Sequence, residues 1–242
     1  RNKVYISMNV GERENSPCLT SDTSFQVSLA DAKNKVWWKF YIMRPGLFEQ
    51  AVGIISANLN KDRDGIYQSA WALAELDHWD MENERIVVLT DSNMVVVKFN
   101  FSSMCIESWR MFKLRQIDGV QTGPFVYPKR NVTTARAHQS GVRISWNKKE
   151  VLSLWQRFSP LFNSPSYVTF SEHKAASQLN SCPPYMNLQE FKKAVILASQ
   201  TSGALFEGVD GPIYLEVYIG AASMIHNSPD LGYSMERVIA AF

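Results

Sequence analysis

An acidic segment with one histidine contains the residue types that could do chemistry. Within eight positions it holds Asp77, His78, Asp80, Glu82 and Glu84. Such a set can bind a metal ion or supply a general acid and base. However, the spacing of a calcium-binding loop is absent, and no second histidine lies one helical turn away. The segment therefore predicts a solvated, exposed loop anchored by Trp79, and an enzyme using residues 77–84 stays open as an alternative.

The other histidines and cysteines show no reactive or metal-binding pattern. The four histidines are at least 35 residues apart, and no Cys-x-x-Cys or His-x-x-x-His pair occurs. None of Cys18, Cys105 and Cys182 has an arginine six positions later, as the anion-binding loop of a cysteine phosphatase requires. Walker, dinucleotide-binding and Gly-x-Ser-x-Gly motifs are also absent. We therefore predict no catalytic residue, cofactor or metal site, and a protein that is not an enzyme.

A basic stretch is the one charged feature with a clear sign. Residues 129–149 contain no acid, and their cations are Lys129, Arg130, Arg136, Arg143, Lys148 and Lys149. A basic stretch of this kind attracts an anionic membrane or an inositol phosphate headgroup, and each basic residue near the membrane surface contributes about 1 kcal/mol to binding. A solvated loop whose charges balance acids elsewhere is the alternative. We predict an anionic-lipid contact here, with phosphoinositide-dependent membrane recruitment as an alternative function.

A possible partner helix follows the basic stretch. Over residues 150–158 the apolar side chains fall on one helical face, formed by Val151, Leu154, Trp155 and Phe158. A basic, tryptophan-bearing amphipathic segment is typical of calmodulin targets, and residues 33–40 have the same character. Burial of the same stripe in the core is the alternative.

The element that must organise the fold is a predicted β-hairpin. Two apolar, β-branched runs, residues 86–89 and 95–97, flank Asp91, Ser92 and Asn93, whose short side chains suit a tight turn. Each run is apolar at consecutive rather than alternating positions. We therefore expect both faces of these strands to be covered, at the centre of a sheet or small barrel.

Two helices and several more strands surround the hairpin in the sequence. Apolar residues recur at three- and four-residue steps over residues 47–60, which predicts a helix after Pro45-Gly46. Asn187 begins a second helix as its cap, and Gly203 ends it. Residues 68–173 read mostly as short strands, with a break at Gly123-Pro124. Among them, Val168 and Phe170 alternate with Thr169 and Ser171, which predicts a strand with one wet face. This order predicts an α+β fold that is antiparallel and strand-rich, with flanking helices.

Length and composition bound the remaining possibilities. The 242 residues favour one domain over residues 36–242, and the polar residues 1–35 predict a poorly ordered extension. A net charge of +2 does not indicate nucleic-acid binding, and we predict no nucleic-acid partner. Three scattered cysteines indicate a reducing compartment. No apolar run approaches the roughly 20 residues that span a bilayer.

Six short stretches, in their order and spacing, resemble one known family. They are Arg44-Pro45-Gly46 with Glu49-Gln50-Ala51, residues 76–91, residues 123–130, Ile144-Ser145-Trp146, residues 167–173 and residues 231–237. Together they are similar to the tumour-protein-regulated-gene family of vesicle-associated proteins. That family carries the homology domain first described in a Sac-type inositol phosphatase, without the phosphatase domain itself.

The resemblance implies a pleckstrin-homology-like domain that self-associates as a homodimer and has no enzymatic activity. It implies a cytoplasmic protein held peripherally on synaptic vesicles, where it regulates presynaptic transmitter release. It also implies calmodulin and the active-zone scaffold Bassoon as partners. Residues 1–35 show no pattern of this family.

Overall fold

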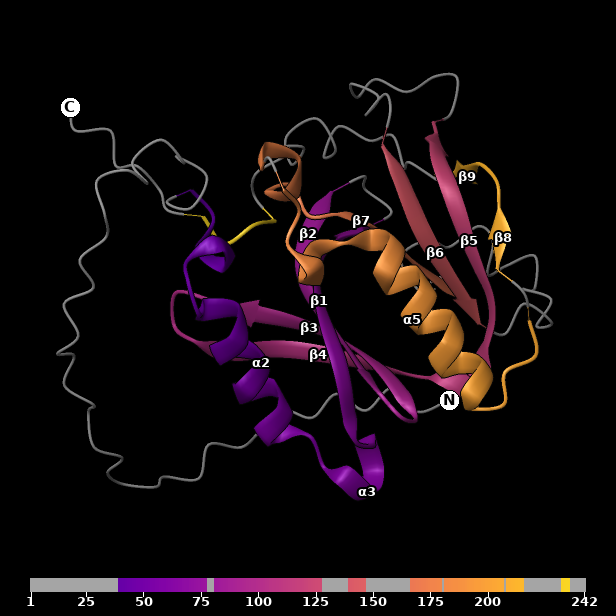
Figure 1. The fold of residues 1–242 in the computed structure, drawn as a ribbon, viewed down its shortest axis with the longest axis horizontal. Coiled ribbons are helices and arrows are strands. Elements are labelled where there is room, and N and C mark those ends of the chain that lie inside the picture. The colour runs from indigo at the N-terminus through magenta and orange to yellow at the C-terminus, as the bar shows by residue number, and fades with distance from the viewer. Residues whose placement is uncertain are drawn as a thin grey trace, which may run out of the picture. The chain divides into compact units, whose positions relative to one another are not determined.

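The computed structural model describes residues 39–77, 81–127, 139–146, 166–179, 181–206, 208–215 and 232–235 (Figure 1). The predicted extension at residues 1–35 lies outside these residues. So do His78, Trp79 and Asp80 of the acidic segment, and the whole of the predicted partner helix.

The described strands form one mostly antiparallel sheet. They are β1 (Tyr67–Leu76), β2 (Glu82–Thr90), β3 (Asn93–Asn100), β4 (Cys105–Lys113), β5 (Ile117–Val126), β6 (Ser140–Trp146), β7 (Tyr167–Glu172), β8 (Val209–Asp210) and β9 (Ile213–Tyr214). Their order is β4-β3-β2-β1-β7-β6-β5-β8, and β9 also pairs with β5. Only β8 and β9 pair in parallel, both with β5. Among the described strands this sheet is open, because β4 and β8 lie at its two ends.

Helices and short 3-10 turns lie against the sheet. The helices are α2 (Leu47–Asn58), α3 (Lys61–Asp64) and α5 (Leu188–Thr201), and the turns are η2 (Tyr41–Met43), η3 (Leu114–Gln116), η4 (Ala176–Gln178) and η5 (Pro184–Met186). In Figure 1, α2 and α5 lie on opposite sides of β1. The predicted fold class, α+β with a strand-rich antiparallel sheet and flanking helices, is confirmed.

Local signals placed both long helices correctly. Gly46 precedes α2 with a φ of 78°, a left-handed conformation that glycine adopts without steric cost. At α5 the Asn187 side chain accepts hydrogen bonds from the amides of Gln189 (3.0 Å) and Glu190 (3.1 Å). These bonds satisfy two of the four amides that a helix start leaves unpaired. The predicted cap is confirmed.

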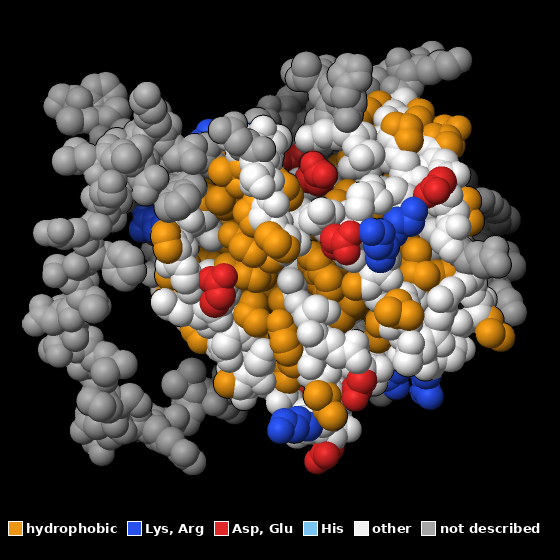
Figure 2. All heavy atoms as spheres, viewed as in Figure 1, with side chains coloured by type: hydrophobic (Ala, Val, Ile, Leu, Met, Phe, Trp, Pro, Cys, Tyr) orange, Lys and Arg blue, Asp and Glu red, His pale blue; other side chains and the backbone are white. Residues whose placement is uncertain are grey.

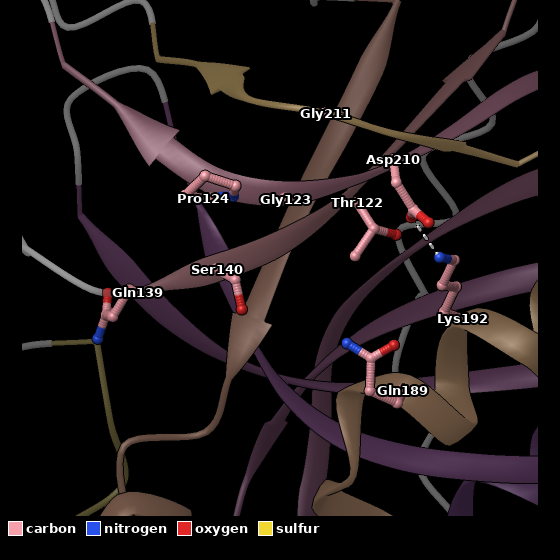
Figure 3. A pocket seen from close by; sticks show the side chains of 9 residues that line it. All are labelled: Thr122, Gly123, Pro124, Gln139, Ser140, Gln189, Lys192, Asp210 and Gly211. Atoms are coloured by element: carbon pink, nitrogen blue, oxygen red, sulfur yellow. Dashed lines mark hydrogen bonds and ion pairs between the residues drawn. The ribbon is translucent and has the colours of Figure 1, made fainter.

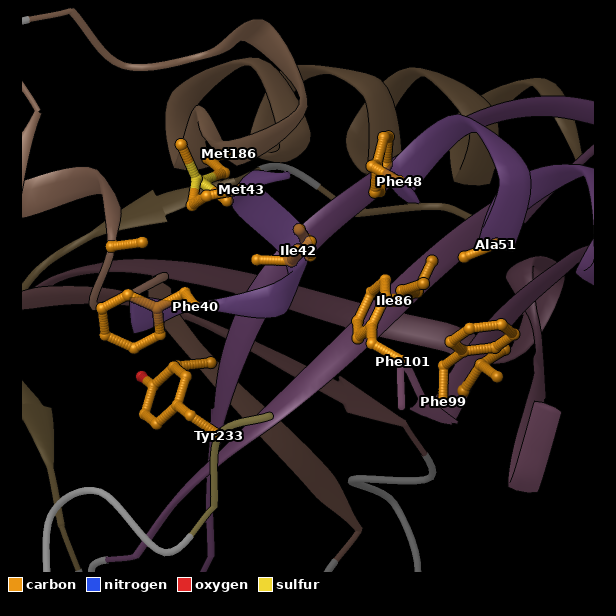
Figure 4. Close-up of a cluster of buried hydrophobic side chains, with 14 of the residues drawn as sticks. Phe40, Ile42, Met43, Phe48, Ala51, Ile86, Phe99, Phe101, Met186 and Tyr233 are labelled. Carbon is orange, nitrogen blue, oxygen red and sulfur yellow. The ribbon is translucent and has the colours of Figure 1, made fainter. Parts of the chain in front are cut away.

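The β2–β3 hairpin is buried on both faces, as its apolar runs predict. Alternate residues of β1, β2 and β3 join Ala51 and Ile55 of α2 in one core cluster (Figure 4). The residues between them join Phe191 and Val195 of α5 in a second cluster on the opposite face. Because successive side chains of a strand point to opposite faces, a strand between two helices must be apolar at every position.

Two details of the strand prediction are wrong. The first is the break at Gly123-Pro124, because β5 runs through both residues to Val126. The Phe125 amide donates to the carbonyl of Gln139, just before β6, so the Pro124 nitrogen faces the other side, toward β8 and β9, and β6 loses no hydrogen bond through it. The second is the wet face predicted for β7, because Thr169 and Ser171 are buried on the face of the sheet that carries the first core cluster, where Ser171 pairs with Ala74.

Candidate functional site

The structure separates the acidic segment into a turn and a buried strand face. Asp77 follows β1 and accepts a hydrogen bond from the Met81 amide (2.9 Å). Glu82 and Glu84 lie in β2 and are only 6% and 5% exposed. The prediction of a solvated loop is therefore wrong for these two carboxylates. They lie two residues apart, so both point to the face of β2 that α2 and η2 cover.

Glu84 binds a buried histidine that is distant in the sequence. His173 Nε2 lies 2.8 Å from Glu84 Oε1, and His173 Nδ1 accepts the Ala175 amide at 3.1 Å. Because Nδ1 acts as an acceptor, the proton sits on Nε2, which donates to the carboxylate. The other carboxylate oxygen accepts the Ser234 amide at 3.1 Å. Both polar ends of this pair are thus hydrogen-bonded inside the protein.

Glu82 binds the second group that sequence reasoning missed. The Tyr233 hydroxyl donates to Glu82 Oε2 at 2.7 Å. Burial raises the pKa of Tyr233 above its ordinary value, and the neighbouring Glu82 charge raises this pKa further. The tyrosine ring stands edge-on to His173 and to Phe40, at centroid distances of 4.9 and 5.7 Å. Figure 4 shows Tyr233 beside Phe40 at the end of the first core cluster.

This arrangement is suited to hold a peptide segment. Tyr233 and Ser234 belong to the short segment 232–235, whose polar groups pair with Glu82 and Glu84. Within the described residues, no group of three or more Asp, Glu, His and Cys side chains could hold a metal ion. No signal near Glu82 or Glu84 could have identified these partners, which lie 89 to 151 positions further along the chain.

A second charged cluster lies on the opposite face of the sheet. Glu75 of β1 accepts hydrogen bonds from Arg85 of β2 (2.8 Å) and from Arg110 of β4. Beside it, Lys98 pairs with Glu107 at 2.7 Å. Glu75 is 8% exposed, and its charge is compensated by two guanidinium groups. The Glu75 pairs join β1 to β2 and β4, and the Lys98–Glu107 pair joins β3 to β4. The sequence analysis did not identify this cluster.

Only Arg143 of the basic stretch lies in the described residues. It sits in β6 with its guanidinium 4.3 Å from the centre of the Tyr167 ring. Its Nε donates to the Thr169 hydroxyl at 3.0 Å. Arg143 therefore packs across the β6–β7 pair. Outside the described residues lie Lys129, Arg130, Arg136, Lys148 and Lys149, together with the predicted partner-helix residues Val151, Leu154, Trp155 and Phe158.

A shallow depression of about 460 Å³ lies between β5, β6, β8 and the first turns of α5 (Figure 3). Lys192 on its rim pairs with Asp210 at 2.7 Å. The Thr122 hydroxyl in its wall is buried, and no described residue offers it a hydrogen-bond partner. None of the residues predicted from the sequence as site residues lines this depression.

The surface seen in Figure 2 carries scattered charges. Lys and Arg side chains on its described part do not gather into one patch, and hydrophobic side chains occupy the middle of this face. No helix in the described segments is long and apolar enough to cross a bilayer.

Comparisons with known proteins show what this chain is similar to. Residues 39–147 match the family model described as hSac2: Inositol phosphatase. The human Tumor protein p63-regulated gene 1 protein is 27% identical over 208 residues, which cover 82% of this chain and 75% of that protein. The hSac2 domain from human phosphoinositide phosphatase Sac2 gives a TM-score of 0.46 at 13% identity, covering 72% of this chain and 94% of that chain. From η2 to β6, then, this chain matches the hSac2 model, and over most of its length it is similar to a p63-regulated gene protein.

Proposed function

We propose that this protein is a non-catalytic binding protein that self-associates and attaches peripherally to vesicle membranes, where it regulates release. The similarity to a p63-regulated gene protein supports this proposal. The more specific part of the proposal, the presynaptic role and its partners, rests on the six sequence stretches alone. It makes the chain a counterpart of Mover, the mossy-fibre-terminal vesicle-associated protein, in the cytoplasm of presynaptic terminals, with calmodulin and Bassoon as partners.

The burial and hydrogen bonding of Glu84 and His173 are the observation that supports the non-catalytic part of the proposal. His173 is 0% exposed and Glu84 is 5% exposed, and each bonds to a backbone amide as well as to the other. A general acid or base must reach the proton that it transfers. Groups enclosed in this way support the protein's structure and its recognition of other chain segments.

Vesicle flotation tests the membrane part of the proposal. The full chain is mixed with vesicles of phosphatidylcholine alone or with added phosphatidylserine, and the floating fraction is measured. We expect flotation with the anionic vesicles, because each cation near the surface adds about 1 kcal/mol. The variant Lys129→Glu/Arg130→Glu/Arg136→Glu should lose it. The matched control, Lys61→Glu/Arg115→Glu/Lys193→Glu, reverses three exposed cations elsewhere and should float normally.

The same assay separates general anion attraction from headgroup recognition. Vesicles of equal charge are compared, one set with phosphatidylserine and the other with a phosphoinositide. Equal flotation supports peripheral attachment through charge. Flotation that requires the phosphoinositide and saturates with it supports the alternative, a phosphoinositide-binding recruitment module. No flotation by the wild-type chain with either set contradicts both.

Light scattering tests self-association. Over a range of protein concentrations, the measured mass should reach twice the chain mass of 27.5 kDa. A constant mass near that of one chain would contradict the homodimer.

A further inference from the structure

The end of β2 projects past its neighbour. β2 pairs with β1 as far as Glu82, but its register with β3 covers only Ile86 to Leu89. Residues 82–85 therefore have no β3 partner on that side. Buried backbone groups at such a strand end require a hydrogen-bond partner from elsewhere.

Residues 232–235, which we call the strap, supply that partner. The Glu84 amide donates to the Gly232 carbonyl at 2.8 Å. In return, the Ser234 amide donates to the Glu84 carboxylate at 3.1 Å. On its other side the strap accepts the Tyr41 amide at 3.0 Å through the Ser234 carbonyl, and Met235 bridges to Phe40. The strap thus lies between β2 and η2, with backbone hydrogen bonds to both.

Gly232 and Tyr233 make this contact selective for the amino-acid sequence of the bound segment. At Gly232 a Cβ atom would overlap the backbone carbonyl of Glu82, which cannot move away as a flexible side chain could. At Tyr233 the ring fills a space bounded by Phe40 and His173, and its hydroxyl reaches the buried Glu82 carboxylate. The site therefore requires a glycine followed by a residue with both an aromatic ring and a hydroxyl.

We propose that the projecting end of β2, with Phe40, Tyr41 and His173, is a peptide-docking site for a Gly-Tyr segment, which the chain fills with its own detachable strap. Recognition combines main-chain hydrogen bonds to an unpaired strand end with a pocket for one side chain, as in β-strand addition. Among the described residues, the strap joins no strand of the sheet and forms one isolated β-bridge, between Met235 and Phe40. It is tethered to the site that it fills, so its effective concentration is in the millimolar range and a free peptide competes poorly.

A full-length Gly232→Val variant tests the proposal. The added side chain expels the strap but leaves Glu82, Glu84 and His173 unchanged. The probe is a fluorescein-labelled synthetic peptide of residues 229–238, and the measurement is fluorescence anisotropy. We expect saturable binding to the variant and at least about tenfold weaker binding to the wild-type chain, whose site is occupied.

Altered peptides serve as matched controls. A peptide carrying Tyr233→Phe should bind at least about tenfold more weakly, since it lacks the hydrogen bond to a buried carboxylate. A peptide carrying Gly232→Val should not bind. Absence of binding to a folded Gly232→Val chain, equal binding to both chains, or equal binding of all three peptides would overturn the proposal.

Hydrogen exchange on the wild-type chain keeps the proposal testable if Gly232→Val fails to fold. The amides of Tyr41, Glu84 and Ser234 all bond across the strap contact. If the strap detaches, these three amides exchange with one common opening free energy, which is lower than that of the Val96 amide in the buried hairpin. Exchange of all four only through global unfolding would overturn the proposal.

Discussion

Replacing Tyr233 by phenylalanine should destabilise the protein through one defined interaction. The substitution keeps the ring between Phe40 and His173 and removes only the hydroxyl that donates to Glu82 at 2.7 Å. A hydrogen bond to a charged acceptor contributes about 1.5–3 kcal/mol. We therefore expect the free energy of unfolding to fall by about 1.5–3 kcal/mol, since the acceptor is a buried carboxylate.

Urea denaturation followed by far-ultraviolet circular dichroism measures this change. The midpoint should decrease while the slope with denaturant stays the same, because the surface exposed on unfolding is unaltered. Tyr214→Phe is the matched control, since Tyr214 in β9 is 65% exposed. Its effect should stay within about 0.5 kcal/mol.

The pH dependence gives an independent readout. The pKa of Tyr233 is raised in the folded protein, whereas in the unfolded chain it returns to about 10. The unfolded chain alone loses this proton above about pH 10, so the contribution of Tyr233 is present below that pH and is lost as the pH rises further. The stability of the wild-type chain should therefore decline more steeply than that of Tyr233→Phe, by up to about 1.4 kcal/mol per pH unit. Parallel curves above pH 10, or a loss no larger than that of Tyr214→Phe, would refute the reasoning.

Four further substitutions test other parts of the fold. Phe191→Ala empties a fully buried position between α5 and the sheet and should cost about 3–5 kcal/mol in urea denaturation. Hydrogen bonds from the Arg63 guanidinium lower the pKa of buried Asp64, so the contribution of Asp64 to the free energy of unfolding is lost as the pH falls below about 4. In Asp64→Asn the free energy of unfolding should therefore depend less steeply on pH in the acid range. Gly123→Ala should lower the midpoint of thermal unfolding, because the added Cβ would overlap the facing carbonyl of the β8–β9 connection. Gly53→Ala, in open space on α2, should instead raise the free energy of unfolding by about 0.5–1 kcal/mol. Equal effects of the two glycine substitutions would contradict the close approach at β5.

The elements that the sequence predicts correctly are those with local causes. The consecutive apolar residues of the β2–β3 hairpin indicated burial on both faces, and two separate core clusters cover them. Asn187 indicated the start of α5 because a cap bonds to amides only two and three residues away. Periodicity and capping act within one or two turns, so they can be seen without knowledge of the fold.

The same local reading failed where the fold adds a partner. Pro124 reads as a strand breaker, but β5 continues because its missing N–H faces the side away from β6. Thr169 and Ser171 read as a wet face, but they lie on the face of the sheet that carries the first core cluster, where Ser171 pairs with Ala74. In both cases the neighbour that decides the outcome comes from another part of the chain.

By itself, the sequence determined which residues form the hairpin, where α2 and α5 begin, and that the fold is α+β. Only the tertiary structure decided that Glu82 and Glu84 are buried against His173 and Tyr233 rather than solvated. Two carboxylates at alternate positions of a strand have the same pattern whether water or protein covers them. Here the residues that cover them lie 89 to 151 positions away in the sequence. Local periodicity contains no information about contacts at that separation.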